Sequence, residues 1–379
     1  MSRFIMVFLS VFIGVHALFF LRIRVLFMDK WGIQWLVILG MTLMVFVPIA
    51  SYMLERNDHD LLARCMAFLG FSWMGLIFIA FSISFLMTVY DGIIWIINTV
   101  TPADLPSLYG KTQALVMIGL IVIISLYGIY EARQICVEPV RIETDKLPEG
   151  TDMLKIAQIS DIHLGLIIRE GFLKKIVEKI ESIKPDILVC TGDYVDSSLR
   201  NMNYLTEYIN KIDIRYGKYA VTGNHESFAR LDHALAFFKK SGFTVLRGET
   251  TTLGNIINIA GVDDSRSREM AGGTDHTRVL DALPEKDNGL FTVLLKHRPD
   301  IKAESLGRFD LQLSGHTHKG QIFPFYFIVK YPFPLIAGLY KLGKGSLLYV
   351  NRGTGTWGPP MRILAPPEIT LIELVRKTY

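Results

Sequence analysis

Four apolar stretches in the first third of the chain constrain its fold more than any other feature. They cover residues 4–21, 35–54, part of 61–90, and 113–130, and none of them contains an internal Asp, Glu or Lys. A helix needs about 20 apolar residues to cross the hydrocarbon core of a bilayer. We therefore predict an α-helical membrane region with four transmembrane helices over residues 1–135.

The first stretch resembles a secretory signal, because Arg3 precedes an apolar run. However, Arg22 and Arg24 occupy the place where small residues would mark a cleavage site, so we expect an uncleaved anchor. A further apolar run over 92–100 is too short to cross a bilayer. We expect it to lie in the interface plane with Trp95 as an anchor, or to pack on the spans.

The short loops give a small charge bias for the orientation of the spans. One side carries four basic residues, Arg22, Arg24, Lys30 and Lys111. The other side carries five, Arg3, Arg56, Arg64, Arg133 and Arg141. Because Lys and Arg accumulate in cytoplasmic loops, this bias predicts both termini inside and the region after the fourth span in the cytoplasm.

After residue 131 the chain has the composition of an ordinary folded domain. Residues 136–152 are predicted to form an extended linker. Beyond them, apolar runs of strand length alternate with segments of helical spacing, which predicts a layered α/β unit over 153–379. The net charge of +4 is too small to indicate a nucleic-acid partner by itself, and three widely spaced cysteines exclude a disulfide framework.

Side chains that can bind metals or move protons follow five predicted strands. They are Asp161 and His163, then Asp193, then Asn224 and His225, then His297, and finally His316 and His318. In α/β sheets, ligands bind beyond the carboxyl ends of the strands. We therefore expect these eight side chains to converge on one site.

Carboxylate, imidazole and amide groups suit divalent ions such as Mn, Fe or Zn. Asp161 and His163 are two residues apart, so both point to one side of an extended segment, and His316 and His318 repeat this spacing. Each motif alone is common in turns, and it is their combination that indicates a site. Eight groups exceed the needs of one tetrahedral ion, which predicts two ions that share a carboxylate and act on a phosphoryl group.

The segment over about 154–374 resembles the calcineurin-like metallophosphoesterase family. The family pattern appears here as DIH at 161–163, GDYVD at 192–196, GNHE at 223–226, His297, and GHTH at 315–318. The resemblance implies a four-layer α/β sandwich and a metal-dependent phosphoric ester hydrolase. With its C-terminal tail, the segment is most similar to a membrane-anchored bacterial branch that includes UDP-diacylglucosamine pyrophosphate hydrolase-type phosphodiesterases, which implies the inner cell membrane.

The resemblance also implies a role for each residue. One ion would be held by Asp161, His163, Asp193 and His318, and the other by Asp193, Asn224, His297 and His316, with Asp193 bridging. His225 would not be a ligand; it would stabilise charge or protonate the leaving oxygen. Asp196 and Glu226 would orient ligand histidines, and Lys319, where many relatives have Gly, would contact substrate phosphate or remain solvated.

An aromatic stretch over 322–340 follows the GHTH motif, and its prolines argue against a spanning helix. It would form either an apolar lip that enters the membrane or holds an acyl chain, or strands and loops that pack on the core. With four spans, the expected partners are the lipid bilayer and a phosphorylated lipid or nucleotide-lipid substrate.

Two other functions remain open at this point. A nuclease-type phosphodiesterase with the same core is disfavoured by the near-neutral charge and the membrane spans, so nucleic acid is not an expected partner. A non-enzymatic membrane sensor or scaffold is disfavoured because every ligand of the family pattern is present.

Overall fold

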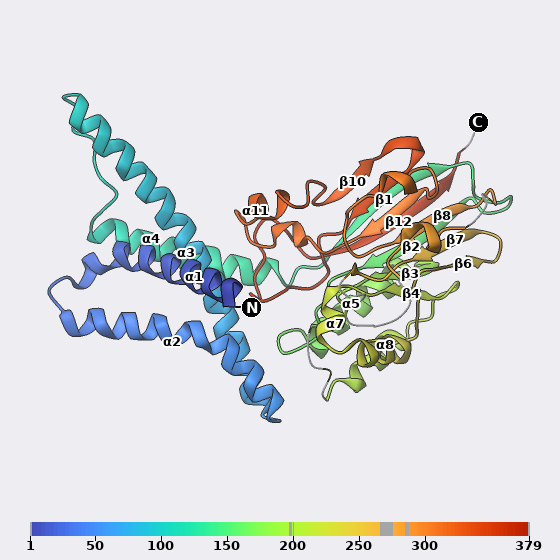
Figure 1. Ribbon diagram of the computed structural model, residues 1–379, viewed down its shortest axis with the longest axis horizontal. Coiled ribbons are helices and arrows are strands. Elements are labelled where there is room, and N and C mark those ends of the chain that lie inside the picture. The colour runs from blue at the N-terminus through green and yellow to red at the C-terminus, as the bar shows by residue number, and fades with distance from the viewer. Residues whose placement is uncertain (1, 197–198, 200, 266–275, 285–287, 378–379) are drawn as a thin grey trace. The chain divides into compact units, whose positions relative to one another are not determined.

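The computed structural model (Figure 1) describes residues 2–196, 199, 201–265, 276–284 and 288–377. The chain divides into two compact units. The first comprises Met1–Tyr130 with Gly358–Met361, and the second comprises Glu131–Trp357 with Arg362–Tyr379.

The first unit is built from long apolar helices. They are α1 Ser2–Ile23, α2 Trp31–Arg56, α3 Asp60–Val100 and α4 Lys111–Glu131, with the short 3-10 helix η1 Arg24–Phe27 after α1. Within the described residues, four helices are long and apolar enough to cross a membrane. Between α2 and α3 the backbones lie very close, because a Cβ on Gly70 would be 2.9 Å from the ring of Pro48. Small residues allow such approaches between membrane helices.

The apolar run over 92–100 is not a separate interfacial segment. It is the last part of α3, which continues without a break for 41 residues. Asp91 is accommodated in this helix because its carboxylate pairs with Arg22 of α1 at 2.5 Å. At 1.5 Å per residue α3 is about 60 Å long, so it exceeds the roughly 30 Å of a bilayer core.

The second unit contains two six-stranded sheets. The first sheet has the order β1-β12-β2-β3-β4-β5. Its strands are β1 Cys136–Thr144, β2 Met153–Ile159, β3 Ile187–Thr191, β4 Lys218–Val221, β5 Phe243–Val245 and β12 Glu368–Arg376. Strands β2 to β5 run parallel, and β12 runs antiparallel to β2.

The second sheet has the order β10-β11-β9-β8-β7-β6. Its strands are β6 Glu249–Leu253, β7 Ile257–Gly261, β8 Phe291–Leu295, β9 Leu311–Ser314, β10 Gly338–Lys341 and β11 Leu347–Val350. Strands β7, β8, β9 and β11 are parallel, and the edge strands β6 and β10 are antiparallel to their neighbours.

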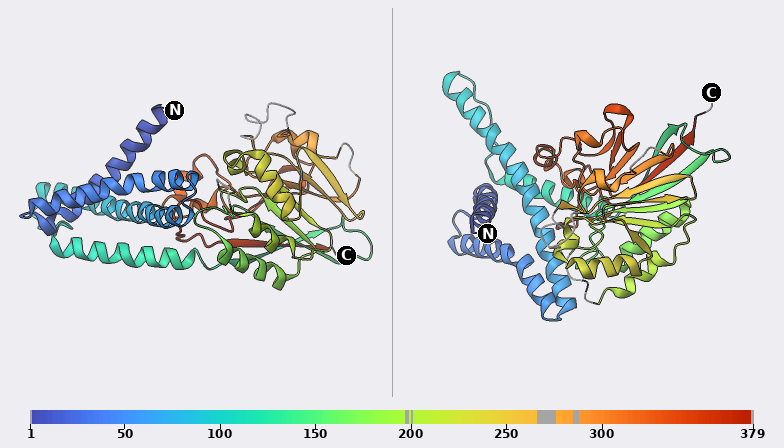
Figure 2. Two further views of the ribbon diagram at one scale, coloured as in Figure 1. Left: turned by 90° about the horizontal axis from the view of Figure 1, so that it is seen from below. Right: turned by 45° about the vertical axis from the view of Figure 1, so that its right-hand side comes forward.

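Helices complete the layers. The longer ones are α5 Glu170–Ile183 and α8 Leu231–Lys240. Short ones are η2 Asn203–Leu205, α6 Thr206–Asn210, α7 Asn224–Phe228, α10 Val279–Ala282, η3 Ala303–Ser305, η4 His318–Gly320, α11 Tyr326–Lys330 and η5 Gly343–Gly345. Figure 2 shows the green and yellow helices along one face of the first sheet.

Side chains that alternate along each strand determine which layers pack on the two faces of the first sheet. In β2, Ala157 packs in a core with Ile176 of α5 and Phe237 of α8, whereas its neighbour Ile156 packs in a second core with Val293 of the other sheet. Successive strand residues point to opposite faces of a sheet, so the first sheet is covered by helices on one side and by the second sheet on the other. A further core joins α10 to the outer face of the second sheet. The predicted four-layer α/β sandwich is confirmed.

The prediction of a linker over 136–152 is wrong for its first half. Residues Cys136–Thr144 form β1, which pairs in parallel with β12 near the chain's C-terminus. Pro139 and the charged residues around it suit an edge strand, where one side of the backbone has no strand partner. A strand whose only partner lies more than 200 residues away leaves no local pattern.

Candidate metal centre

The ends of five strands bring the predicted site residues together. Asp161 and His163 follow β2, Asp193 follows β3, Asn224 opens α7 after β4, His297 follows β8, and His316 and His318 follow β9. Asp161 and His297 are fully buried, and Asp193 is 2% exposed. The loops that follow the carboxyl ends of strands in both sheets therefore meet at one buried polar site.

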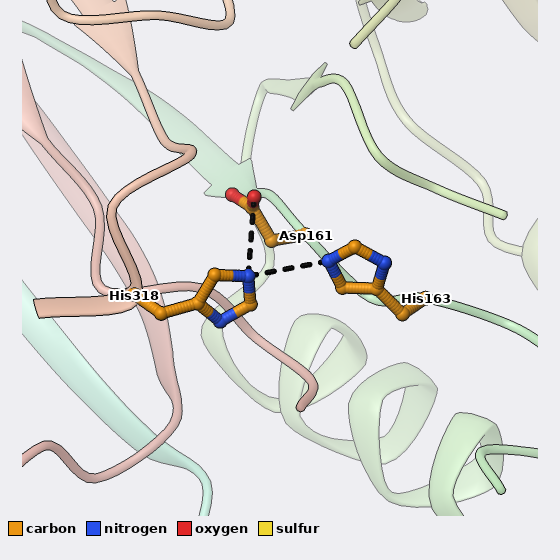
Figure 3. Close-up of side chains that lie close together, drawn as sticks. All are labelled: Asp161, His163 and His318. Carbon is orange, nitrogen blue, oxygen red and sulfur yellow. Dashed lines mark hydrogen bonds and ion pairs between the residues drawn. The ribbon is translucent and has the colours of Figure 1, made fainter. Parts of the chain in front are cut away.

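One group of donor atoms contains Asp161, His163 and His318 (Figure 3). Nε2 of His318 lies 3.4 Å from Oδ1 of Asp161 and 3.2 Å from Nε2 of His163. Oδ2 of Asp193 lies 3.8 Å from the same nitrogen of His163. These four side chains are the set that the resemblance assigns to the first ion.

A second group surrounds the same carboxylate. Nε2 of His297 lies 3.3 Å from Oδ2 of Asp193 and 3.2 Å from Oδ1 of Asn224. Nδ1 of His316 lies 3.2 Å from that nitrogen of His297. Oδ2 of Asp193 is therefore close to both groups, which is the position that a bridging ligand requires.

The backbone of the site is strained. Five of the seven predicted ligands have positive φ angles, namely Asp161 at 52°, His163 at 56°, Asp193 at 49°, His316 at 73° and His318 at 47°. Left-handed backbone is uncommon for residues with a Cβ, although Asp and His adopt it more readily than most. Such conformations cost of order 1–3 kcal/mol each and cluster at functional sites. The fold thus holds these five residues in an unfavourable backbone conformation, and in this conformation their side chains meet at the site.

Glycines allow the loops to approach one another closely. A Cβ on Gly315 would overlap the side-chain oxygens of Ser160 and Asp161, and a Cβ on Gly223 would overlap the carboxylate of Asp193. A side chain at either position would collide with these atoms, so only glycine fits there.

The protonation states of the site fit divalent ions. Burial lowers the pKa of His316 to about 3 and that of His318 to about 4, so both rings offer lone pairs at neutral pH. Burial opposes ionisation of Asp193, but the charge of His297 outweighs it and holds the pKa of Asp193 well below its usual range. A buried carboxylate together with the neutral imidazoles of His316 and His318 is a donor set that suits a divalent cation.

The ring of His297 is oriented so that its Nε2 can bind a metal ion. Its Nδ1 donates to the backbone oxygen of Thr191 at 2.8 Å, which directs Nε2 toward Asp193 and Asn224. Burial opposes protonation of His297, but the carboxylate of Asp193 raises its pKa to about 10. A cation that binds here therefore displaces a proton, as is usual for histidine ligands.

His225 and Asp196 form a pair at the edge of this centre. Nδ1 of His225 lies 3.0 Å from Oδ1 of Asp196, and Nδ1 of His163 lies 3.5 Å from the same oxygen. Burial opposes protonation of His225, but the carboxylates of Asp193 and Asp196 raise its pKa to about 9. His225 is thus protonated near neutral pH, and the carboxylate of Asp196 lies close to both histidines.

Glu226 does not orient ligand histidines, contrary to the prediction. Its carboxylate accepts the backbone N–H groups of Gly223, Asp193, Tyr194 and Val195. Glu226 therefore fixes the loop that carries Asp193, the residue shared by the two donor groups. Burial and the charge of Asp193 raise the pKa of Glu226 to about 7.

Arg362, which is fully buried, was not expected at the site. Its guanidinium donates to the backbone oxygens of Arg352, Gly353, Gly355 and Ala365, and Nη2 lies 3.0 Å from Nδ1 of His318. Arg362 thus holds together the backbone of the loop after β11 and contacts His318, a predicted metal ligand. Its 44-residue distance from His318 in the sequence hid this relationship.

A cavity of about 770 Å³ opens beside His297. Among the described residues, its lining includes Lys296, Arg298 and Phe333. Arg298 is held by a pair to Asp264 at 2.6 Å. Lys319 lies in η4 directly after His318 and is half-buried, and its contact with substrate stays a prediction.

Two sheets between helices, with Asp, Asn and His converging from their strand ends, define a metal-dependent phosphoric ester hydrolase. The family model described as calcineurin-like phosphoesterase matches residues 154–320. A metallophosphoesterase of Aquifex aeolicus is 41% identical over 257 residues, which cover 68% of this chain and 98% of the relative. The chain belongs to the calcineurin-like metallophosphoesterase family.

Other relatives are matched over part of their length. A zebrafish protein named as a transmembrane protein with metallophosphoesterase domain is 33% identical, and the match covers 69% of this chain but 62% of that protein. Among solved structures, a 5'-nucleotidase from Staphylococcus aureus matches with 14% identity and a TM-score of 0.36, covering 60% of this chain and 55% of that one.

Proposed function

We propose that the protein is a membrane-anchored phosphoesterase that hydrolyses a phosphodiester or pyrophosphate bond in a lipid or a lipid-linked nucleotide. The observation that carries the proposal is that two groups of donor atoms share Oδ2 of Asp193. An arrangement of this kind suits in-line displacement at phosphorus between two ions.

The cofactors proposed are two divalent ions, with Mn, Fe or Zn as candidates. Asp161, His163 and His318 would hold one, and Asn224, His297 and His316 the other, with Asp193 between them. When bound, the ions activate water and neutralise phosphate charge. The residues themselves fix the donor atoms, since every one of these side chains is buried except that of His316, which is half-buried.

His225 is the proposed proton donor to the leaving oxygen. Its Nδ1 is tied to Asp196, so Nε2 is the nitrogen that remains to face a substrate. A histidine that is protonated near neutral pH suits general-acid catalysis. Lys319 and Arg298 are proposed to contact anionic parts of the substrate, Arg298 from the wall of the cavity beside His297.

The membrane location rests on the four apolar helices and on the name of the zebrafish relative. We propose the inner cell membrane of a bacterium, with the catalytic unit on the cytoplasmic side as the loop charges favour. The substrate proposed for that place is one embedded in the bilayer, such as a UDP-sugar lipid.

A panel of substrates tests this function. The full chain, purified in detergent and loaded with Mn²⁺, Fe²⁺ or Zn²⁺, is assayed on simple phosphate esters, UDP-sugar lipids, phospholipids and single-stranded DNA. We expect hydrolysis of a lipid-type diester or pyrophosphate, and loss of it in Asp193→Ala. Glu207→Ala, a change at an exposed helix position, is the matched control. Preference for DNA would favour a nuclease, and no hydrolysis with any metal would favour a scaffold.

A further inference from the structure

We propose that an aromatic surface beside the metal centre docks on the lipid bilayer, so that the mouth of the site opens at the membrane. The surface consists of Phe323, Phe325, Phe327, Ile328, Tyr331 and Trp357. The docking stands on its own, whereas uptake of substrate directly from the leaflet rests on the proposed function.

These side chains are exposed where a soluble domain would bury them. Tyr331 is 91% exposed, Phe327 63% and Ile328 59%, and α11 contributes no buried residue. The expectation that this stretch packs on the core is therefore wrong for α11. Contiguous exposed apolar residues mark an interaction surface rather than an ordinary one.

The composition of the surface suits the interface of a membrane. Aromatic rings with a polar edge, such as those of Tyr331 and Trp357, prefer the headgroup region of a bilayer. Nζ of Lys330 lies 5.5 Å from the ring centre of Tyr326 in the same helix. Lys330 is itself exposed, so its positive charge is available to attract anionic headgroups.

The surface is joined directly to the metal centre. The side chain of Gln321 donates to the backbone oxygen of Trp357 and accepts from its backbone N–H, which holds Trp357 beside the aromatic stretch. The ring of Trp357 lies 5.9 Å from that of His225. On another side of the centre, Phe333 of the same stretch lies 4.9 Å from His316. The surface therefore borders the metal centre through Trp357.

The covalent connection identifies the bilayer as the occupant. Helix α4 ends at Glu131, and β1 begins at Cys136. Only four residues lie between them, and the five Cα–Cα steps from Glu131 to Cys136 span at most about 18 Å, so β1 begins within that distance of the end of an apolar helix. A short tether gives the two surfaces a high effective concentration. A second copy of the chain has no comparable connection.

Quenching by brominated lipid tests the docking in the full chain. A fluorescent non-canonical amino acid replaces Phe327, or Tyr204 as a control that is 45% exposed in the same unit. Each protein is placed in nanodiscs of phosphatidylcholine and phosphatidylglycerol, with or without bromine on the acyl chains. We expect bromine to reduce the fluorescence at position 327 and to leave position 204 unchanged.

Every other outcome overturns the docking. Equal fluorescence at position 327 in both nanodiscs means that water, another copy or the chain's own helices face the surface. Quenching at both positions means that lipid contact is not specific to the aromatic surface. None of these readings depends on catalysis.

A double variant, Phe327→Ser with Ile328→Ser, tests the uptake of substrate. We expect it to lose hydrolysis of a lipid embedded in nanodiscs while it keeps hydrolysis of a small soluble diester, which also reports that the site is folded. Tyr204→Ser should change neither activity. Equal losses on both substrates would overturn uptake from the leaflet. If the wild-type protein hydrolyses neither substrate, the proposed function fails while the quenching result stands.

Discussion

Nδ1 of His225 lies 3.0 Å from Oδ1 of Asp196. The same ring also contacts the backbone oxygen of Asp196 at 3.1 Å. These contacts leave Nε2 as the nitrogen that can give a proton to a leaving group. Together with Asp193, the carboxylate of Asp196 raises the pKa of His225 to about 9 against the effect of burial.

The Asp196–His225 pair predicts a pH effect. His225 donates its proton only while it is protonated, so activity is lost as the pH rises through its pKa. Asp196→Asn removes a negative charge and keeps an acceptor, so the alkaline limb of the kcat profile should move to lower pH, toward the ordinary histidine value of about 6.5. Asp196→Glu, which keeps the charge, is the control. An alkaline limb that stays in place in Asp196→Asn would show that His225 is not the acid.

Glu226 is predicted to stabilise the loop of Asp193. Its carboxylate accepts four backbone N–H groups, and Gln at this position would direct its own N–H₂ group at some of them. Leaving buried donors unpaired costs about 1–3 kcal/mol. We expect Glu226→Gln to lower the melting temperature of the full chain in detergent. Glu207→Gln, at an exposed pair with Lys211, should have little effect, and equal melting temperatures for both variants would refute this role.

Gly315 is predicted to tolerate no side chain. A Cβ at this position overlaps Ser160 and Asp161, so Gly315→Ala must displace the carboxylate of a predicted ligand. We expect this variant to lose most of its activity and to bind metal more weakly. At Gly343 a Cβ would meet Leu306 at 3.6 Å, an ordinary contact, so Gly343→Ala should retain both properties. Full activity of Gly315→Ala would contradict the close approach of these loops.

Arg362 is predicted to position His318. Arg362→Met removes the N–H groups that donate to several backbone oxygens. The loop after β11 and the ring of His318 therefore lose the contacts that position them. We expect a lower melting temperature and a weaker affinity for one of the two ions, measured by Mn²⁺ titration. Arg362→Lys should restore part of both. Loss of stability with unchanged affinities would make Arg362 structural only.

The site residues could be predicted best where a recognisable motif follows a strand. Asp161, Asn224 and His316 follow buried strands, and the structure brings them together because parallel strands end at one edge. The apolar helices were also visible, since a bilayer core demands their length.

Relationships between distant segments could not be predicted. Strand β1 pairs with β12, and Arg362 reaches His318; neither contact leaves a local pattern. Glu226 was recognised as part of the site, but its direction was missed because a side chain's partner depends on loop geometry. The length of α3 was missed as well: the helix continues past residue 90 to Val100, and Asp91 within it pairs with Arg22 of α1.

The central claim is that Asp193 joins two ion sites. Calorimetric titration of Mn²⁺ into the metal-stripped full chain tests it most directly, with Asp193→Ala and Glu207→Ala titrated in parallel. We predict two ions per chain in the wild-type protein and in Glu207→Ala, and weakened binding at both sites in Asp193→Ala. A single site in the wild-type protein, or a loss confined to one site in Asp193→Ala, would contradict the account.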